Sequence, residues 1–192
     1  MLHLHQPTDE GWFDRIEPHL NTVLLDHAHL EKRAASAAMS MMFRYTDKPD
    51  LARALAEVVH EEIEHFTQML DILADRGVAY ENIEPASYAG RLMKKTARKD
   101  PDALLDKLLV SSLIEARSCE RFKILSERIE AAELAEFYRE LMVSEARHHT
   151  LYTGIARQLF PEDRVDQRLE ELAQLEWDAI RQSTEAPRLH SF

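Results

Sequence analysis

The sequence predicts an all-α protein, a four-helix bundle with additional helices towards its N-terminal and C-terminal ends. Apolar residues recur at helical spacing along most of the chain, and only four glycines and seven prolines are available for turns in 192 residues, too few for a β-rich fold. Four helices of about 25 residues would each be about 37 Å long, enough to enclose a site at mid-height. We expect one domain over residues 1–192, with loosely ordered ends at 1–7 and 183–192.

The N-terminal half is expected to contain one short helix and two long ones. Thr8 or Asp9 could cap the short helix, because their side chains can accept hydrogen bonds from the first free backbone N–H groups. Long helices are predicted over residues 20–45 and 50–76, with Gly77 placed to end the second in a left-handed conformation.

The C-terminal half is expected to contain one short helix and three longer ones. A crossover after the second long helix could include a short helix within residues 85–99. Asp100 is placed to cap a third long helix, which we expect over residues 101–129. A fourth is predicted over residues 131–160, and a last amphipathic helix over residues 162–182.

One arrangement of metal-binding residue types occurs twice. In each copy a lone glutamate in an apolar helical stretch is followed, 31 or 30 residues later, by a Glu-x-x-His motif. A carboxylate and an imidazole at positions i and i+3 lie on one face of a helix, so both can reach one metal ion. Two helical hairpins of this kind supply the ligand set of a di-iron or di-manganese carboxylate bundle. The six predicted ligands are Glu31, Glu62, His65, Glu115, Glu145 and His148.

A single Glu-x-x-His motif is common in helices, where its usual meaning is a surface acid beside a core histidine. Two copies, each preceded by a glutamate among apolar positions, favour a dinuclear metal centre instead. Four carboxylates balance two divalent ions, whereas four like charges without metal would lie together in an apolar core. Carboxylate and imidazole ligands suit iron, and manganese stays open as an alternative.

Small and apolar residues lie at helical spacing from the predicted ligands: four follow Glu31 or Glu115, and one precedes Glu145. They could line a pocket for dioxygen and a substrate, or they could simply pack the core. These residues are Ala35, Ala38, Cys119, Phe122 and Met142.

The net charge of −11 argues against non-specific binding of a polyanion by the whole surface, so a nucleic-acid site must be a local patch. One candidate patch has basic residues at i, i+3, i+4, i+7 and i+8 and no acid among residues 91–99. On a helix these side chains form one stripe suited to phosphate contacts, or a solvated face that pairs with acids elsewhere. They are Arg91, Lys94, Lys95, Arg98 and Lys99.

The chain has the features of a cytoplasmic protein. The single Cys119 excludes an intrachain disulfide framework and fits a reducing compartment. No apolar run approaches the ~18 residues that span a bilayer, and the N-terminus lacks the basic and apolar blocks of a signal peptide. We therefore expect no membrane partner.

The run from Ser112 to Phe122, SLIEARSCERF, together with the six predicted ligands, resembles the bacterial tRNA hydroxylase family called MiaE. The ligand positions are shared by many ferritin-like proteins and identify that superfamily, whereas the run points to this one family. The resemblance implies a ferritin-like four-helix bundle that holds two iron ions. It also implies hydroxylation of the isopentenyl group of 2-methylthio-isopentenyl-adenosine next to the anticodon in tRNA, with dioxygen as co-substrate. Electrons would come from an external ferredoxin or reductase, because the sequence has no flavin or cysteine-cluster motif.

Two other functions fit the same ligand set. A di-iron hydroxylase of a small apolar substrate such as a quinone is one, although we would expect it to carry an apolar membrane-facing helix. A ferritin-like or rubrerythrin-like protein that handles iron or peroxide is the other. Rubrerythrins usually add a four-cysteine iron site, which one cysteine cannot form.

Overall fold

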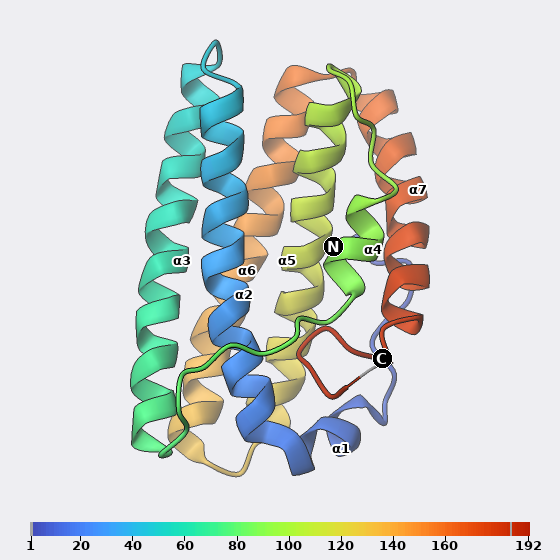
Figure 1. Ribbon diagram of the computed structural model, residues 1–192. Coiled ribbons are helices and arrows are strands. Elements are labelled where there is room, and N and C mark those ends of the chain that lie inside the picture. The colour runs from blue at the N-terminus through green and yellow to red at the C-terminus, as the bar shows by residue number, and fades with distance from the viewer. Residues whose placement is uncertain (1, 185) are drawn as a thin grey trace. The chain divides into compact units, whose positions relative to one another are not determined.

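A computed structural model describes residues 2–184 and 186–192, and every regular element within them is a helix (Figure 1). The all-α prediction is therefore confirmed. No helix in the described part of the chain is long and apolar enough to cross a membrane. The elements are α1 (Trp12–Ile16), the 3-10 helix η1 (Glu17–His19), α2 (Leu20–Arg44), α3 (Pro49–Asp75), α4 (Tyr88–Met93), α5 (Asp102–Arg128), α6 (Ala132–Leu159) and α7 (Glu162–Arg181).

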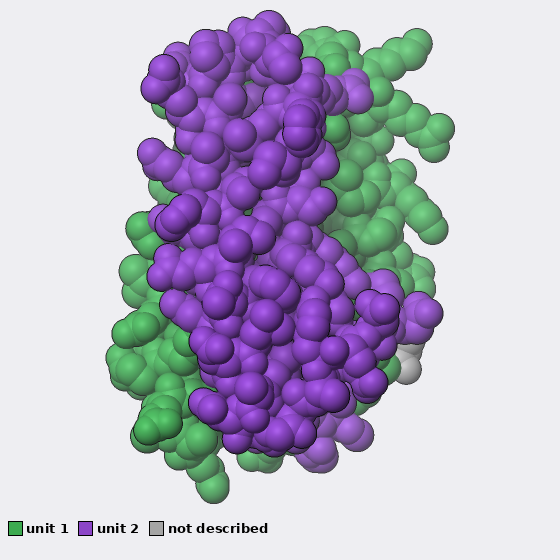
Figure 2. Space-filling model, turned by 60° about the vertical axis from the view of Figure 1, so that its left-hand side comes forward, with its two compact units in different colours: residues 1–17, 86–192 green, residues 18–85 purple. Residues whose placement is uncertain are grey.

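The chain divides into two compact units, coloured separately in Figure 2. Unit 2 comprises residues 18–85 and is a helical hairpin in which α2 packs along α3. On α3 buried residues recur every three or four positions, as the sequence predicts. On α2 the buried residues include Leu24, Ala28, Glu31, Ala35 and Ala38. Glu31 is thus a buried carboxylate beside apolar side chains, on a helix that also buries Asp26, His27 and His29.

Gly77 ends α3 as predicted. Its φ of +67° is a conformation that glycine adopts without steric cost. The N–H of Val78 donates to the carbonyl of Leu73 at 2.8 Å, and the N–H of Gly77 donates to that of Ala74 at 3.0 Å. These two bonds form a Schellman motif, which satisfies carbonyls at the end of the helix.

Unit 1 comprises residues 1–17 and 86–192 and is built around α5. The α5 helix packs along α6 and also contacts α1, α4 and α7. Most of its residues are buried as a consequence, including the charged side chains of Asp106, Glu115, Arg117 and Arg121. A helix covered on this many sides must carry its own polar partners or receive them from its neighbours.

The short helix expected within residues 85–99 is α4, and beyond it the Ala97 N–H donates to Asp106 Oδ2 at 2.7 Å rather than to the carbonyl of Met93. Two expectations about helix ends are wrong. Asp100 does not cap α5, which begins at Asp102 with no side-chain cap bond. Neither Thr8 nor Asp9 caps α1, which follows Gly11 with no side-chain cap bond.

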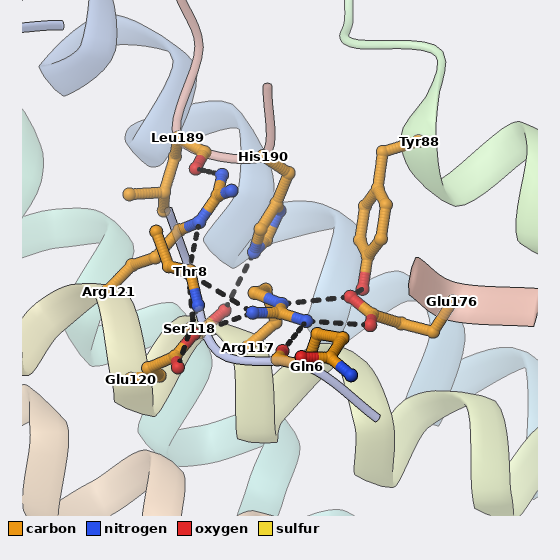
Figure 3. Close-up of polar contacts among 10 residues, drawn as sticks. All are labelled: Gln6, Thr8, Tyr88, Arg117, Ser118, Glu120, Arg121, Glu176, Leu189 and His190. Atoms are coloured by element: carbon orange, nitrogen blue, oxygen red, sulfur yellow. Dashed lines mark hydrogen bonds and ion pairs between the residues drawn. The ribbon is translucent and has the colours of Figure 1, made fainter. Parts of the chain in front are cut away.

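A buried ion pair joins α5 to α7 within unit 1 (Figure 3). Arg117 Nε and Nη2 donate to the two carboxylate oxygens of Glu176 at 2.9 and 2.8 Å, and both side chains are fully buried. Burial opposes the charge on Arg117, but Glu176 outweighs it and raises the pKa of the guanidinium. Arg117 also donates to Glu120 at 2.6 Å and to the carbonyl of Gln6 at 3.1 Å, so the N-terminal segment is joined to the same pair.

Arg121, one turn further along α5, joins the C-terminal segment to this helix. Its Nη1 donates to the carbonyl of Leu189, and its guanidinium lies 4.6 Å from the centre of the Trp12 ring. Burial and the nearby charge of Arg117 lower the pKa of Arg121 to about 9. We call the ten residues drawn in Figure 3 the terminal clasp: Gln6, Thr8, Tyr88, Arg117, Ser118, Glu120, Arg121, Glu176, Leu189 and His190.

The terminal clasp overturns the expectation of a loosely held C-terminus at residues 183–192. Ser183, Leu189, His190 and Ser191 are buried, and the Phe192 N–H donates to the carbonyl of Ser183 at 2.9 Å. At the other end, Gln6 contributes its carbonyl to Arg117 although its side chain is exposed. Residues 1 and 185 belong to the same expectation and lie outside the described residues.

Replacing Glu176 with glutamine should destabilise the protein by about 3–5 kcal/mol, because Arg117 would keep its buried charge without a counter-charge. Urea unfolding followed by circular dichroism measures the change. Glu170→Gln, at an exposed acid on the same helix, is the matched control and should change stability by no more than about 0.5 kcal/mol. Equal unfolding midpoints for the two variants would contradict this account of the clasp.

Candidate metal centre

The first half of the candidate site lies within unit 2. The α2 helix contributes Glu31, and α3 contributes Glu62 and His65 one turn apart on its inner face. Each residue offers one ligand atom, and these atoms lie within 4.8 Å of one another. His65 Nδ1 is 3.6 Å from an oxygen of Glu31 and 4.0 Å from one of Glu62. All three residues are buried, and we call them the first triad.

The second half lies within unit 1 and repeats this arrangement. The α5 helix contributes Glu115, and α6 contributes Glu145 and His148. Their ligand atoms also lie within 4.8 Å of one another, and His148 Nδ1 is 3.9 Å from a Glu145 oxygen. All three are buried, and we call them the second triad. Each unit thus brings three of the six predicted ligands near one another, a lone glutamate and one Glu-x-x-His motif.

His27 is a member of the first site that sequence reasoning missed. It is fully buried one turn before Glu31, and its Nε2 is bonded to the Glu31 carboxylate. Burial disfavours the charged form of Glu31, but His27 and the nearby His65 outweigh it and hold the pKa of Glu31 well below its usual range. Glu31 is therefore ionised, as a metal ligand must be.

A polar contact that the sequence also did not reveal links α5 to α6 beside the second triad. His149 Nδ1 lies 2.8 Å from Ser112 Oγ and 2.9 Å from the Ser112 carbonyl oxygen. Thr153 Oγ1 lies 2.7 Å from the same hydroxyl, and all three residues are buried. Because Ser112 is one turn before Glu115 and His149 follows His148, these bonds fix the register of the two ligand-bearing helices.

The donor set of each triad fits an iron ion. Two carboxylates and one imidazole combine hard oxygen ligands with the nitrogen ligand that iron and its neighbours accept. Each triad also places two acidic groups in a buried position, where a divalent cation would offset their charge. Either triad could hold one such ion through Glu, Glu and His.

The predicted pocket residues lie on the same helices as the ligands. Ala35 and Ala38 are buried on α2, and Cys119 and Phe122 are buried on α5. Met142 is half-buried on α6, and its carbonyl accepts a hydrogen bond from Cys119 Sγ at 3.4 Å. Burial raises the pKa of Cys119 above its usual value, so the thiol is neutral. Their role in a pocket stays a prediction.

The predicted basic stripe does not lie on one helix. Arg91 is half-buried on α4, where its Nε donates to Ser87 Oγ at 2.7 Å and its Nη1 to Gln182 Oε1 at 3.2 Å. The remaining four basic residues follow the end of α4 and are exposed in an irregular loop. We call residues 94–99 the basic loop; its cations are Lys94, Lys95, Arg98 and Lys99.

Replacing His27 with alanine should weaken metal binding at the first triad about 10- to 100-fold, the usual cost of losing a residue that orients a ligand. Titration of metal-free protein with Fe(II) against a chromophoric chelator measures the affinity. His60→Ala, at an exposed histidine of α3, is the control and should bind like the wild type. If His27→Ala binds as tightly as this control, His27 does not support Glu31.

The chain is similar to known proteins along most of its length. A family model described as tRNA-(MS[2]IO[6]A)-hydroxylase (MiaE) matches residues 1–191. The tRNA 2-(methylsulfanyl)-N(6)-isopentenyladenosine(37) hydroxylase of Pseudomonas putida is 33% identical over 185 residues, 96% of this chain and 90% of that protein. The protein of the same name from Salmonella typhimurium is 33% identical over 169 residues, 86% of this chain but only 60% of its own length.

A solved structure is similar along nearly the whole chain. It is described as protein 43 with aldehyde deformylating oxygenase activity from Synechococcus, and it superposes with a TM-score of 0.94 at 40% sequence identity. The match covers 98% of this chain and 95% of the other. The predicted ferritin-like fold class is thereby confirmed.

Proposed function

Because the chain belongs to the MiaE family of tRNA hydroxylases, we propose that it hydroxylates the isopentenyl group of 2-methylthio-isopentenyl-adenosine next to the anticodon in tRNA. The observation that carries the proposal is the family match over residues 1–191. Two buried Glu, Glu, His triads support it, because they are the donor groups that oxygen-dependent iron enzymes of this fold use. We propose accordingly that the protein acts on tRNA, in the cytoplasm.

The proposed cofactor is two iron ions, held by the six residues of the first and second triads. Four glutamates and two neutral histidines balance two divalent ions, which supports a site without net charge. We propose that residues 1–192 act as one ferritin-like di-iron domain. When bound, the iron supplies activation of dioxygen and insertion of one oxygen atom into a C–H bond, with electrons from an external ferredoxin or reductase.

The chain itself has three tasks in this reaction. Carboxylates of the triads hold the ions, and His27 keeps Glu31 in the ionised form that binds metal. Apolar side chains exclude water and accept the prenyl group; we assign this role to Ala35, Ala38, Cys119, Phe122 and Met142. The third task is to hold the anticodon loop, since the modified base must be presented unstacked for its prenyl group to reach the iron.

The basic loop is our candidate for contact with the tRNA backbone. Its four cations are exposed, whereas Arg91 is bonded to Ser87 and Gln182 and contributes less. Phosphate contacts of this kind supply affinity without reading sequence. A local group of cations also allows a protein with a net negative charge to bind a polyanion, because only the basic loop has to contact the phosphates.

The activity is tested by expressing the protein in cells that make 2-methylthio-isopentenyl-adenosine but lack its hydroxylase. Mass spectrometry of digested tRNA should detect the hydroxylated nucleoside with the wild type. Glu115→Ala should give none and should lose bound iron, whereas Glu57→Ala, at an exposed acid of α3, should keep both. An unchanged nucleoside profile with iron-loaded wild-type protein would refute the tRNA assignment.

The tRNA contact is tested by the double reversal Lys94→Glu/Lys95→Glu. Affinity for tRNA near 100 mM salt should fall by about tenfold or more, and the salt dependence of binding should become shallower, because fewer phosphates are neutralised. The reversal Lys123→Glu/Arg139→Glu makes the same charge change at exposed residues of α5 and α6 and serves as the control. Both variants should keep the iron content of the wild type, and equal losses of affinity in both would remove the basic loop from the interface.

A second candidate function is oxygen-dependent deformylation of an aldehyde. The observation that favours it is the solved structure with that activity, 40% identical to this chain. The two functions differ in the surface that their substrate requires. An aldehyde requires an apolar channel, whereas tRNA also requires a cationic surface for its phosphates. Gas chromatography of reduced, iron-loaded protein incubated with alkyl aldehydes would detect the shortened hydrocarbon.

A further inference from the structure

A buried carboxylate of α5 binds the backbone in the middle of the basic loop. Asp106 of α5 is 1% exposed. Its Oδ2 accepts the backbone N–H of Ala97 at 2.7 Å, in the middle of the loop. Its two oxygens also accept Arg168 Nε and Nη2, from α7, at 2.7 and 2.8 Å. Both carboxylate oxygens therefore accept hydrogen bonds: Oδ1 from Arg168 alone, and Oδ2 from Arg168 and from the backbone of the loop.

Arg168 extends the attachment to a second backbone position. Its Nη2 donates to the carbonyl of Lys95 at 3.4 Å, and its Nη1 to Glu171 at 2.8 Å. The loop is thus bound at residues 95 and 97, in the midst of the four exposed cations. These bonds are made by the backbone, so they leave the cationic side chains directed to solvent.

We infer that Asp106 is a positioning residue for tRNA binding, which with Arg168 fixes the basic loop in the conformation that meets the phosphates. This inference rests on the proposed function. A loop held in its binding conformation loses less conformational freedom when tRNA binds, and the affinity rises accordingly. Asp106 is too buried to touch the RNA itself, so it acts through the backbone of the loop.

The sign of the expected effect separates this role from simple electrostatics. An acid near a phosphate-binding loop repels the phosphates, so its neutralisation alone would strengthen binding to tRNA. Loss of a positioning residue weakens binding instead. Asp106→Asn therefore distinguishes the two, and Asp102→Asn provides the control. Asp102 lies one turn earlier on α5, is exposed and pairs with Arg164, so the charge change is the same.

The test measures two quantities on iron-loaded, full-length protein: affinity for tRNA by fluorescence anisotropy, and the rate of trypsin cleavage within residues 94–99. We expect Asp106→Asn to bind tRNA about 5- to 10-fold more weakly and to be cleaved faster in the basic loop. Arg168→Gln, which releases the same loop from α7, should show the same faster cleavage. Asp102→Asn should be cleaved like the wild type and bind tRNA equally or more tightly.

Two results would overturn the inference: unchanged cleavage of the loop in Asp106→Asn, or tRNA affinity equal to that of Asp102→Asn. Failure of the proposed function looks different. In that case Lys94→Glu/Lys95→Glu also leaves tRNA affinity unchanged, and the inference falls with it. If that reversal weakens binding while Asp106→Asn does not, the tRNA contact stands and only the positioning role is lost.

Discussion

Buried charge is the constraint on which this protein depends. Each unit contains a helical hairpin that buries two glutamates and a histidine among largely apolar side chains. Carboxylates in such a face cost free energy unless cations or hydrogen bonds compensate them. A protein that needed only stability would place leucine there, so these six residues are better explained by the metal binding that we propose for them. The ordinary α-helical spacing is sufficient to bring each set of three together.

The same constraint recurs outside the triads, and each time the compensating contact also fixes a segment of the chain. Arg117 is compensated by Glu176, and this pair joins α5 to α7. Asp106 is compensated by Arg168 and by the backbone of Ala97, and this contact holds the loop that follows α4. Polar groups buried on α5 are therefore the points at which the surrounding segments are attached. A fully satisfied network of this kind specifies one arrangement of its neighbours.

Local patterns explain what the sequence could reveal. The spacing of apolar residues identified the long helices, because that spacing is a property of each helix alone. The two Glu-x-x-His motifs and the repeat that contains them identified the residues of both triads. The His27–Glu31 contact also follows an i, i+4 spacing and could have been found in the same way. By contrast, nothing near Arg117 indicates that its partner lies 59 residues later in α7. The loop after α4 is likewise bound by Asp106, a residue outside the loop, and helical spacing alone does not reveal this contact. The spacing therefore placed the basic stripe on one helix, although α4 ends at Met93.

The terminal clasp also has a consequence for the order in which this chain can fold during synthesis. Arg117 and Arg121 leave the ribosome well before their partners. Glu176 neutralises Arg117, and the carbonyl of Leu189 accepts a hydrogen bond from Arg121. The helices of residues 18–85, by contrast, have their hairpin partner as soon as α3 is made. The contacts of Arg117 with Glu176 and of Arg121 with Leu189 can therefore form only after these later residues have been translated, and a nascent chain stopped before Glu176 lacks both.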